Sequence, residues 1–299
     1  MSAVLSTKDL VKRYGRAAVL DGLDLEVPEG SIYGYIGSNG AGKTTTIKIL
    51  MNIIKPTSGS ACVLGADSRR LAGDGFQDIG YVSENQEMPE WMTVDYLLRY
   101  LKPFYPAWDD NRANELVKQF KLPRDRELRH LSRGMKMKAM LVAALAYHPK
   151  LLVLDEPFSG LDVVVREDFA ESMVESASET TIFISSHDLA DIESFASHIG
   201  YLENGKLQFS EEMSSLIGRF REVEVLVDPS AVAPGNLQWP DHWLRPETTP
   251  AVIRFVDTQF EAGRTHDEIR RRFGDVSQIA ANPMPLRSIF VALARSASK

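Results

Sequence analysis

A glycine-rich loop between an apolar segment and an amphipathic helix constrains this sequence more than any other feature. The loop fits the pattern G-x-x-x-x-G-K-[ST] with residues Gly37, Ser38, Asn39, Gly40, Ala41, Gly42, Lys43 and Thr44. The apolar run 31–36 before the loop predicts a buried strand, and apolar residues at helical spacing from Ile47 to Ile54 predict a helix after it. A strand, a glycine loop and a helix in this order are typical of an α/β fold.

The chemistry of the loop points to a phosphate ligand. Glycine lets backbone N–H groups turn inward around phosphate oxygens, and the start of the helix adds partial positive charge. Lys43 is placed to reach the β- and γ-phosphates of a nucleotide, and the Thr44 hydroxyl is placed to hold Mg²⁺. The alternative, a plain glycine turn, is weaker because the flanking strand and helix are those that a phosphate loop requires.

Two adjacent acids follow a second apolar strand. The run Leu151 to Leu154 predicts the strand, and Asp155 and Glu156 come directly after it. Ligands bind at the carboxyl ends of strands in open α/β sheets, so Asp155 is a candidate for Mg²⁺. Adjacent strand residues point to opposite faces, which leaves Glu156 to orient or deprotonate an attacking water. A solvated acidic turn is the alternative.

Strand and helix patterns alternate along the first part of the chain, apart from a mainly helical stretch from about 85 to 147. The spacing of apolar residues also predicts a strand over 181–185 and a helix over 189–196. Asn204-Gly205 predicts a type I′ hairpin. This order of elements predicts a mostly parallel sheet with one inserted helical subdomain.

The character of the chain changes past Gly218, which predicts a first domain over 1–217 and a small α+β module over 218–299. The elements expected in this module are, in order, a strand over 223–227, a proline-rich loop, a strand over 251–255 and a helix over 286–294. Thr265 and Glu268 have the spacing of a capping box, which predicts that another helix starts there.

Composition excludes several classes of protein. Apolar residues make up 44% and charged residues 25%, which excludes disordered and coiled-coil chains, and no apolar run reaches the ~20 residues of a membrane span. The single cysteine, Cys62, allows no disulfide within the chain and fits a reducing cytoplasm. The net charge of −7 argues against a general nucleic-acid binder, and 270–272, three arginines, is interpreted as a solvated helix face.

Together these motifs resemble the ATP-binding cassette (ABC) ATPases over residues 3–215. The glycine loop, extended to Thr45, is similar to the family's Walker A loop, and 151–156 is similar to its Walker B strand. Four more segments match in order and spacing, namely the adenine-stacking aromatic at Tyr14, the signature at 131–135, the D-loop at 159–162 and the switch histidine at 185–187. The resemblance implies a P-loop (RecA-like) core with an N-terminal antiparallel β subdomain and the helical insertion.

The resemblance also implies ATP and Mg²⁺ as ligands and ATP hydrolysis as the reaction. In the family two chains join, so that Ser132 and Gly134 of the signature face the phosphate loop of a second subunit and Asp162 couples the two sites. His187 is then expected to hydrogen-bond the γ-phosphate. Taken alone, these residues have plainer interpretations, which are a surface tyrosine at 14, a helix N-cap at 132, a turn acid at 162 and a structural histidine at 187.

Two segments depart from the family pattern. The signature has Arg133 and Met135 where the family has Gly and Gln, and Glu84 stands where the family usually has Gln in the loop after a strand. A carboxylate can coordinate Mg²⁺ or hold a water, so Glu84 is a candidate for both roles, with Gln86 as its substitute. These departures bear on the rate of hydrolysis more than on ATP binding.

Similar departures occur in ATPase subunits of bacterial exporters whose permeases are separate chains. The resemblance therefore implies a transmembrane permease and a second ABC ATPase subunit as partners, no nucleic acid, and a place at the cytoplasmic face of the plasma membrane. The aromatic-rich stretch 91–108 either docks the permease, with Trp91 or Phe104 in the groove, or forms the core of the helical insertion. A soluble ABC ATPase that works on ribosomes or DNA, and a regulatory module with little turnover, are the alternative functions.

Overall fold

The computed structural model describes residues 3–84, 86–177, 179–227, 239–274 and 276–296. The chain divides into two compact units, Met1–Glu211 and Glu212–Lys299. Within the described residues, no helix has the length and apolar character that crossing a bilayer requires.

A six-stranded sheet forms the centre of the first unit, with the strand order β10-β9-β3-β8-β7-β6. Its strands are β3 (Ile32–Ile36), β6 (Ile79–Ser83), β7 (Leu151–Asp155), β8 (Thr181–Ser186), β9 (His198–Glu203) and β10 (Lys206–Glu212). Four neighbouring pairs, β3–β8, β3–β9, β7–β8 and β6–β7, are parallel, which confirms the expected parallel sheet. All residues of β3, β7 and β8 are buried, as in strands that are covered on both faces.

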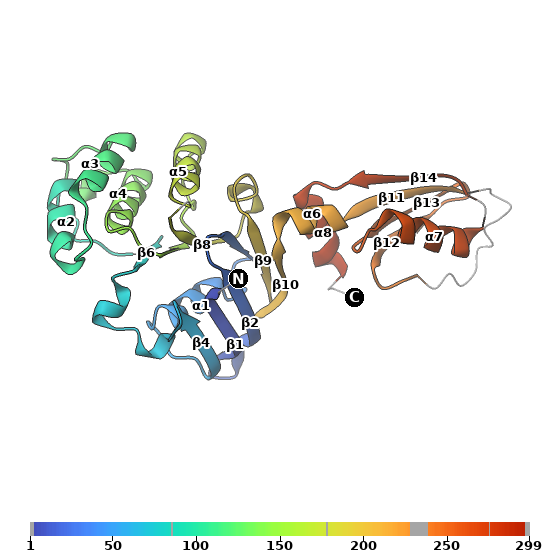
Figure 1. Cartoon of the computed structure of the whole chain (residues 1–299), viewed down its shortest axis with the longest axis horizontal. Helices are drawn as coiled ribbons and strands as arrows, with labels where there is room; N and C mark the ends of the chain where they lie inside the picture. The colour runs from blue at the N-terminus through green and yellow to red at the C-terminus, as the bar shows by residue number, and fades with distance from the viewer. Residues whose placement is uncertain (1–2, 85, 178, 228–238, 275, 297–299) are drawn as a thin grey trace. The chain divides into compact units, whose positions relative to one another are not determined.

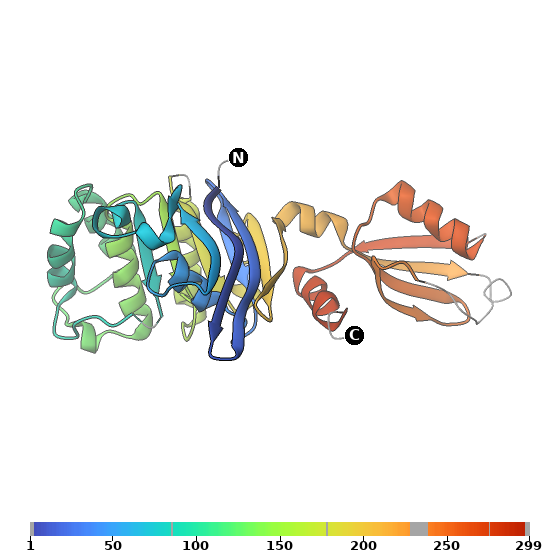
Figure 2. The same ribbon diagram turned by 90° about the horizontal axis from the view of Figure 1, so that it is seen from below.

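A smaller antiparallel sheet, ordered β2-β1-β4-β5, contains a long β1–β2 hairpin (Figure 2). Its strands are β1 (Ala3–Tyr14), β2 (Ala17–Pro28), β4 (Ser58–Val63) and β5 (Ala66–Asp67). Alternate residues of β2, from Leu23 to Val27, are buried, as the period-2 pattern predicts. Helix α1 (Lys43–Leu50) contacts strands of both sheets, so the segment that follows the glycine loop ties the two together.

Three helices between β6 and β7 form the inserted helical part and gather on one side of the unit (Figure 1). They are α2 (Val94–Leu101), α3 (Asp110–Gln119) and α4 (Arg133–Leu145), and α5 (Val163–Ser176) then leads from β7 to β8. Short 3₁₀ turns complete the unit at Ser68–Arg70, Gly73–Phe76, Lys102–Phe104, Leu128–His130 and Leu189–Asp191. Helix α4 packs against β6 and α3, which fixes its first turn relative to the sheet.

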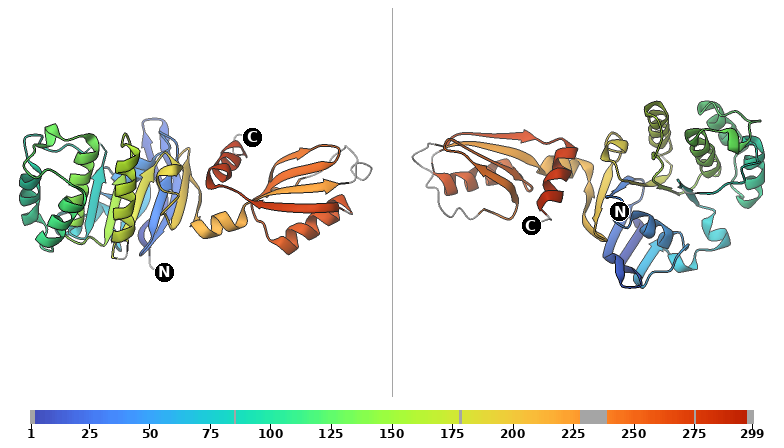
Figure 3. Two further views of the ribbon diagram at one scale, coloured as in Figure 1. Left: turned by 90° about the horizontal axis from the view of Figure 1, so that it is seen from above. Right: turned by 180° about the vertical axis from the view of Figure 1, so that it is seen from behind.

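The second unit is an antiparallel sheet, ordered β12-β13-β11-β14, with α7 along one face (Figure 3). Its elements are α6 (Met213–Arg219), β11 (Arg221–Val227), β12 (Trp243–Thr248), β13 (Val252–Asp257), α7 (Ala262–Phe273), β14 (Val276–Pro283) and α8 (Leu286–Ser296). Its core joins the inward valines of β11 to Trp243, Ile269 and Phe273. The strands expected near 223–227 and 251–255 and the closing helix are confirmed.

Of two local predictions, a turn after β9 is confirmed and a helix after β8 is wrong. Asn204 and Gly205 both have positive φ between β9 and β10, as the predicted type I′ turn requires. The helix predicted over 189–196 is wrong, because only a 3₁₀ turn forms before Ile192 packs onto the sheet, in the space that a Cβ on Gly34 would fill.

The predicted capping box is also wrong. Helix α7 begins at Ala262, so Thr265 lies inside it, and the Thr265 hydroxyl donates to the buried carboxylate of Asp257 (2.6 Å). Of the proline-rich loop, 228–238 lies outside the described residues, and β12 forms in the part that follows.

Candidate active site

The glycine-rich loop runs from the end of β3 into the first turn of α1. Gly37 has no room for a side chain, because a Cβ there would collide with the carbonyl oxygen of Leu202. Gly42 has a φ of +114°, and a Cβ on it would lie 2.9 Å from the carbonyl oxygen of Val19. The other loop residues are exposed, namely Ser38, Asn39 and Gly40, or at least half-buried, namely Ala41, Thr44 and Thr45. Close approach of neighbouring backbone therefore requires glycine at positions 37 and 42.

Lys43 is buried beside the loop. Its Nζ donates to the carbonyl oxygens of Gly37 (2.6 Å) and Ser38 (3.3 Å) and lies 3.1 Å from Oε1 of Glu156. A buried ammonium group is stable only when it is paired and hydrogen-bonded, and these three oxygens supply that pairing. The ammonium is thus held between the start of the loop and the acids that follow β7.

Asp155, the last residue of β7, is buried in a hydroxyl-lined position. The hydroxyls of Thr44 (3.0 Å) and Ser185 (2.8 Å) both donate to its Oδ1. Burial raises the pKa of the Asp155 carboxyl above its usual value, and the two hydroxyl hydrogen bonds oppose that rise. The structure therefore joins two of the three residues that the sequence assigned to Mg²⁺, Thr44 and Asp155.

Glu156 lies just past β7, with a positive φ of 52° that few side chains adopt. Its N–H donates to the hydroxyl of Ser185 (3.0 Å), and its Oε2 accepts from the N–H of His187 (3.3 Å) and lies 2.7 Å from Nδ1 of the same residue. With Lys43 at Oε1, both carboxylate oxygens are engaged. Backbone strain of this kind is typical of functional positions, where the surrounding contacts hold it.

The donor set at Thr44 and Asp155 fits Mg²⁺, which prefers hard oxygen ligands and usually keeps several waters. Within the described ranges no group of three or more His, Cys, Asp or Glu side chains gathers as a metal cage. One hydroxyl and one carboxylate beside a phosphate loop are the small protein share that Mg²⁺ takes when the nucleotide supplies the other oxygens.

The remaining predicted residues lie at separate points of the first unit. Tyr14 ends β1 and is 53% exposed, and the Lys12 ammonium lies 4.9 Å from its ring centroid. Ser132 caps α4, where its hydroxyl accepts from the N–H of Met135 (3.2 Å), and Asp162 caps α5. Gly134 is buried where α4 approaches α5. Ser132 thus has the capping role that its plainer interpretation gave it, and Asp162, whose plainer interpretation was a turn acid, also caps a helix.

Glu84, in the loop after β6, forms an ion pair with Arg133 in the first turn of α4. Its N–H donates to the carbonyl oxygen of Asp155 (3.1 Å), so the residue adjoins the acids after β7. Two of the three residues that depart from the family pattern, one from each segment, therefore contact each other. Sequence reasoning missed this pair, and it missed the role of Ser185, whose place in a buried strand beside β7 was the available signal.

Comparison with known proteins assigns the chain to a family. A family model described as ABC transporter matches residues 20–159. The ABC transporter ATP-binding protein YtrB of Bacillus subtilis (strain 168) is 32% identical, over 75% of this chain and 77% of YtrB. The bacitracin transport ATP-binding protein BcrA of Enterococcus faecalis is 30% identical, over 91% of this chain and 90% of BcrA. The chain belongs to the ABC transporter ATP-binding cassettes.

Solved structures agree with this assignment of the cassette. An ATP-binding subunit of an ABC transporter has a TM-score of 0.66 and 29% identity, covering 71% of this chain and 91% of that one. A dimeric ATP-binding cassette bound to ADP and phosphate has a TM-score of 0.62 at 22% identity, over 70% of this chain and 98% of that one, and supports the fold alone. The expected P-loop α/β fold is confirmed, and the cassette is an ATP-binding, ATP-hydrolysing subunit of an ABC transporter.

Proposed function

We propose that this cassette drives export through a separate transmembrane permease, with ATP joining two cassettes and hydrolysis releasing them. The observation that carries the proposal is the meeting of Lys43, Asp155, Glu156 and His187 at the ends of β3, β7 and β8, which are neighbours in one sheet. The name of BcrA, a bacitracin transport protein, supports a transport role. The cassette then acts at the cytoplasmic face of the membrane, held there by the permease.

In this proposal each residue of the site has one task. The phosphate loop binds the triphosphate of ATP, with Lys43 on the β- and γ-phosphates. Glu156 accepts a proton from the water that attacks the γ-phosphorus, and ADP leaves as the phosphorus–oxygen bond breaks. His187 orients Glu156 and donates to the γ-phosphate. Bound Mg²⁺ would neutralise charge on the phosphate oxygens, with Thr44 and Asp155 as its protein partners.

The remaining predicted residues extend the site towards its other partners. We propose that Tyr14 stacks on the adenine, and that Ser132, Gly134 and Asp162 face a second cassette. Two valines support such an interface, because Val163 and Val164 directly follow Asp162 and are 70% and 66% exposed. Adjacent exposed apolar side chains next to a functional loop are typical of a surface that another chain covers.

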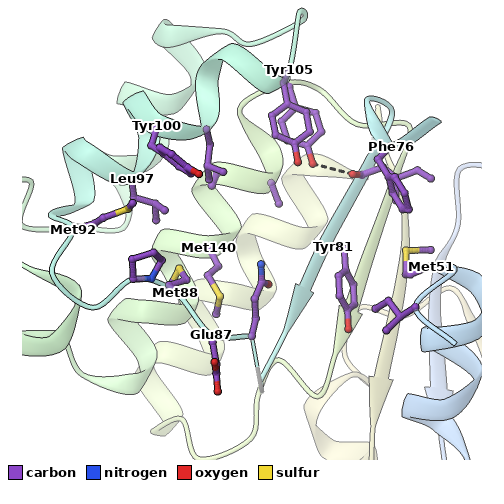
Figure 4. A pocket seen from close by; sticks show the side chains of 18 residues that line it. Met51, Phe76, Tyr81, Glu87, Met88, Met92, Leu97, Tyr100, Tyr105 and Met140 are labelled. Atoms are coloured by element: carbon purple, nitrogen blue, oxygen red, sulfur yellow. Dashed lines mark hydrogen bonds between the residues drawn. The ribbon is translucent and has the colours of Figure 1, made fainter. Parts of the chain in front are cut away.

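A pocket of about 390 Å³ supports a docking place for the permease (Figure 4). Methionines and aromatic rings line it between β6, α2 and α4, among them Met51, Met88, Met92, Tyr100, Tyr105 and Met140. Tyr105 stacks on Tyr147 at 3.8 Å, so it belongs to the wall, whereas Trp91 and Phe104 are 58% and 60% exposed. We propose that a short amphipathic helix of the permease fills the pocket and that these two exposed rings contact it.

The second unit is proposed as an accessory module. We assign residues 1–217 to the nucleotide-binding domain and 218–299 to this module, a division six residues past the boundary between the compact units at Glu211 and Glu212, because the matched region 20–159 and every motif residue precede it. Its own core around Trp243 and Phe273 supports independent packing.

The decisive experiment is purification of the tagged chain from detergent-solubilised native membranes, with bound proteins identified by mass spectrometry. A stoichiometric protein with many membrane spans supports the transporter role. Recovery of the chain alone, or with ribosomes or DNA, contradicts that role and leaves the ATPase activity in place. The low-turnover alternative is tested by the ATPase rate, because a wild type no faster than Glu156→Gln contradicts an energising role.

A further inference from the structure

The ion pair between Arg133 and Glu84 connects two parts of the cassette that are 49 positions apart in sequence. Arg133 belongs to the first turn of α4, and Glu84 to the loop after β6. Their side chains are 48% and 25% exposed, so the carboxylate is the more shielded of the two. The shielding makes the charge of Glu84 more costly to leave unpaired than the charge of an acid on the open surface.

The same guanidinium also reaches the loop after β7. Its Nη2 lies 3.5 Å from the hydroxyl of Ser159, and a Cβ on Gly160 would lie 2.9 Å from its Nη1. Arg133 therefore packs against the D-loop while it pairs with Glu84. One side chain thus contacts the loops that follow two neighbouring strands of the central sheet, β6 and β7.

The charges around this arginine explain what the contact does. The backbone N–H of Glu84 donates to the carbonyl oxygen of Asp155, and Glu156 follows directly, so Glu84 lies in a loop beside the two acids of the proposed triphosphate site. A nucleotide adds several more negative charges. Uncharged residues stand at the positions of Arg133 and Glu84 in the family pattern that the sequence resembles, so this chain carries one extra anion and one extra cation as a contacting pair.

We propose that Arg133 is a positioning residue for ATP binding, which neutralises Glu84 and holds its carboxylate away from the triphosphate. This inference rests on the proposed nucleotide site. Its consequence is an asymmetry between the two partners. Loss of the arginine leaves an anion that repels ATP, whereas loss of the acid leaves a cation that does not.

The test is the affinity for ATP, measured by equilibrium binding in EDTA, so that Mg²⁺ takes no part. We expect Arg133→Ala to raise the Kd about tenfold, because one uncompensated negative charge beside the site repels the triphosphate. Glu84→Gln should bind ATP within about twofold of the wild type or more tightly, and the double variant should return to within about twofold of the wild type. Arg133→Lys keeps the charge and should retain affinity. High salt should shrink the defect of Arg133→Ala.

A second ion pair provides a matched control. Lys136 and Glu90 lie 3.1 Å apart, one turn further along α4, and breaking this pair with Lys136→Ala should leave the Kd unchanged. The inference is overturned if Glu84→Gln weakens binding as much as Arg133→Ala, if the double variant is as weak as Arg133→Ala, or if the defect appears only with Mg²⁺. Failure of the wild type to bind ATP would instead contradict the proposed function itself.

Discussion

Lys43 and His187 hold the Glu156 carboxylate from two sides, with Nζ of Lys43 3.1 Å from Oε1 and Nδ1 of His187 2.7 Å from Oε2. The acid therefore has a fixed direction although it lies outside the regular strand. A lysine from the phosphate loop and a histidine from the end of β8 thus meet on one side chain from the end of β7. This convergence makes Glu156 the residue whose removal is most informative.

Replacement of Glu156 by Gln keeps the size of the side chain and removes its ability to accept a proton. We expect ATP turnover to fall at least ~100-fold, the usual contribution of a general base, while ATP still binds. Phosphate release measures turnover, and size-exclusion chromatography with ATP measures the accumulation of a bound dimer. Glu167→Gln, at an exposed position of α5, is the matched control and should turn over like the wild type. Turnover near the wild-type rate in Glu156→Gln would assign the base elsewhere.

Replacement of Asp155 by Asn separates stability from activity. Because burial raises the pKa of this carboxyl, the folded chain binds its proton more readily than the unfolded chain does. The protonated carboxyl therefore adds to the stability of the fold. This contribution is complete below the unfolded pKa of 3.8 and is lost as pH rises through the raised folded pKa. The charged group thus destabilises the fold near neutral pH, and Asn removes that charge while it can still accept the hydroxyl hydrogen bonds.

We therefore expect Asp155→Asn to melt at a higher temperature than the wild type at about pH 8, with a smaller difference at about pH 4.5. Thermal unfolding without nucleotide or metal measures both. Turnover should fall at least ~100-fold, because the variant loses the charge that Mg²⁺ needs. A variant less stable than the wild type at both pH values would contradict this account of Asp155.

Replacement of Val164 by Asp tests the proposed cassette–cassette interface. An unpaired charge at the centre of an apolar contact is costly, so we expect ATP-dependent dimerisation to weaken at least ~10-fold. Val174→Asp places the same charge on the same helix, at a valine that is 54% exposed. Sedimentation of both variants in the Glu156→Gln background is the measurement, and equal dimerisation of the two would exclude Val164 from the interface.

Replacement of Trp91 and Phe104 by Ala tests the permease surface. Both rings are exposed, so their removal should leave the cassette folded and its ATP affinity unchanged, while recovery of the permease falls at least ~10-fold. The yield of permease per cassette in the membrane purification measures this. The control variant Val174→Ala removes an exposed side chain of α5, outside the helical insertion, and should not alter the yield of permease. Normal recovery with the double variant would place the permease elsewhere.

Local patterns in the sequence predict the parts of this fold that depend on neighbouring residues. The alternating valines of β11 and the buried run of β7 were visible because strand burial has a period of two or is continuous. The edge strand β12 was not predicted, because its Pro246 suggested a loop. In the structure Arg245 has a positive φ before this proline, and the pairing with β13 shifts register there. Proline at a sheet edge is compatible with a strand although it suggests a loop in sequence.

The active site divides in the same way. The phosphate loop and the acids after β7 are contiguous motifs, so their residue types and order predict the chemistry directly. Ser185, which joins Asp155 to Glu156 through one hydroxyl, depends on β8 lying beside β7. The pairing of Arg133 with Glu84 depends on where α4 begins relative to β6. Neither contact follows from a single sequence, because each joins segments that only the folded chain brings together.

The pairing of β7 with β8 also determines how precisely the catalytic side chains are positioned. Asp155 of β7 is aligned with Ser185 of β8, and Leu154 with Ile184. A slip of β8 by one residue towards its carboxyl end would bring Ile184 opposite the acid and carry His187 about 3.3 Å along the strand, out of reach of Glu156. The positions of the catalytic side chains are therefore as precise as the backbone hydrogen bonds of a buried parallel sheet. A substitution deep in β8 that shifts this pairing can abolish ATP hydrolysis although the replaced residue contacts no nucleotide.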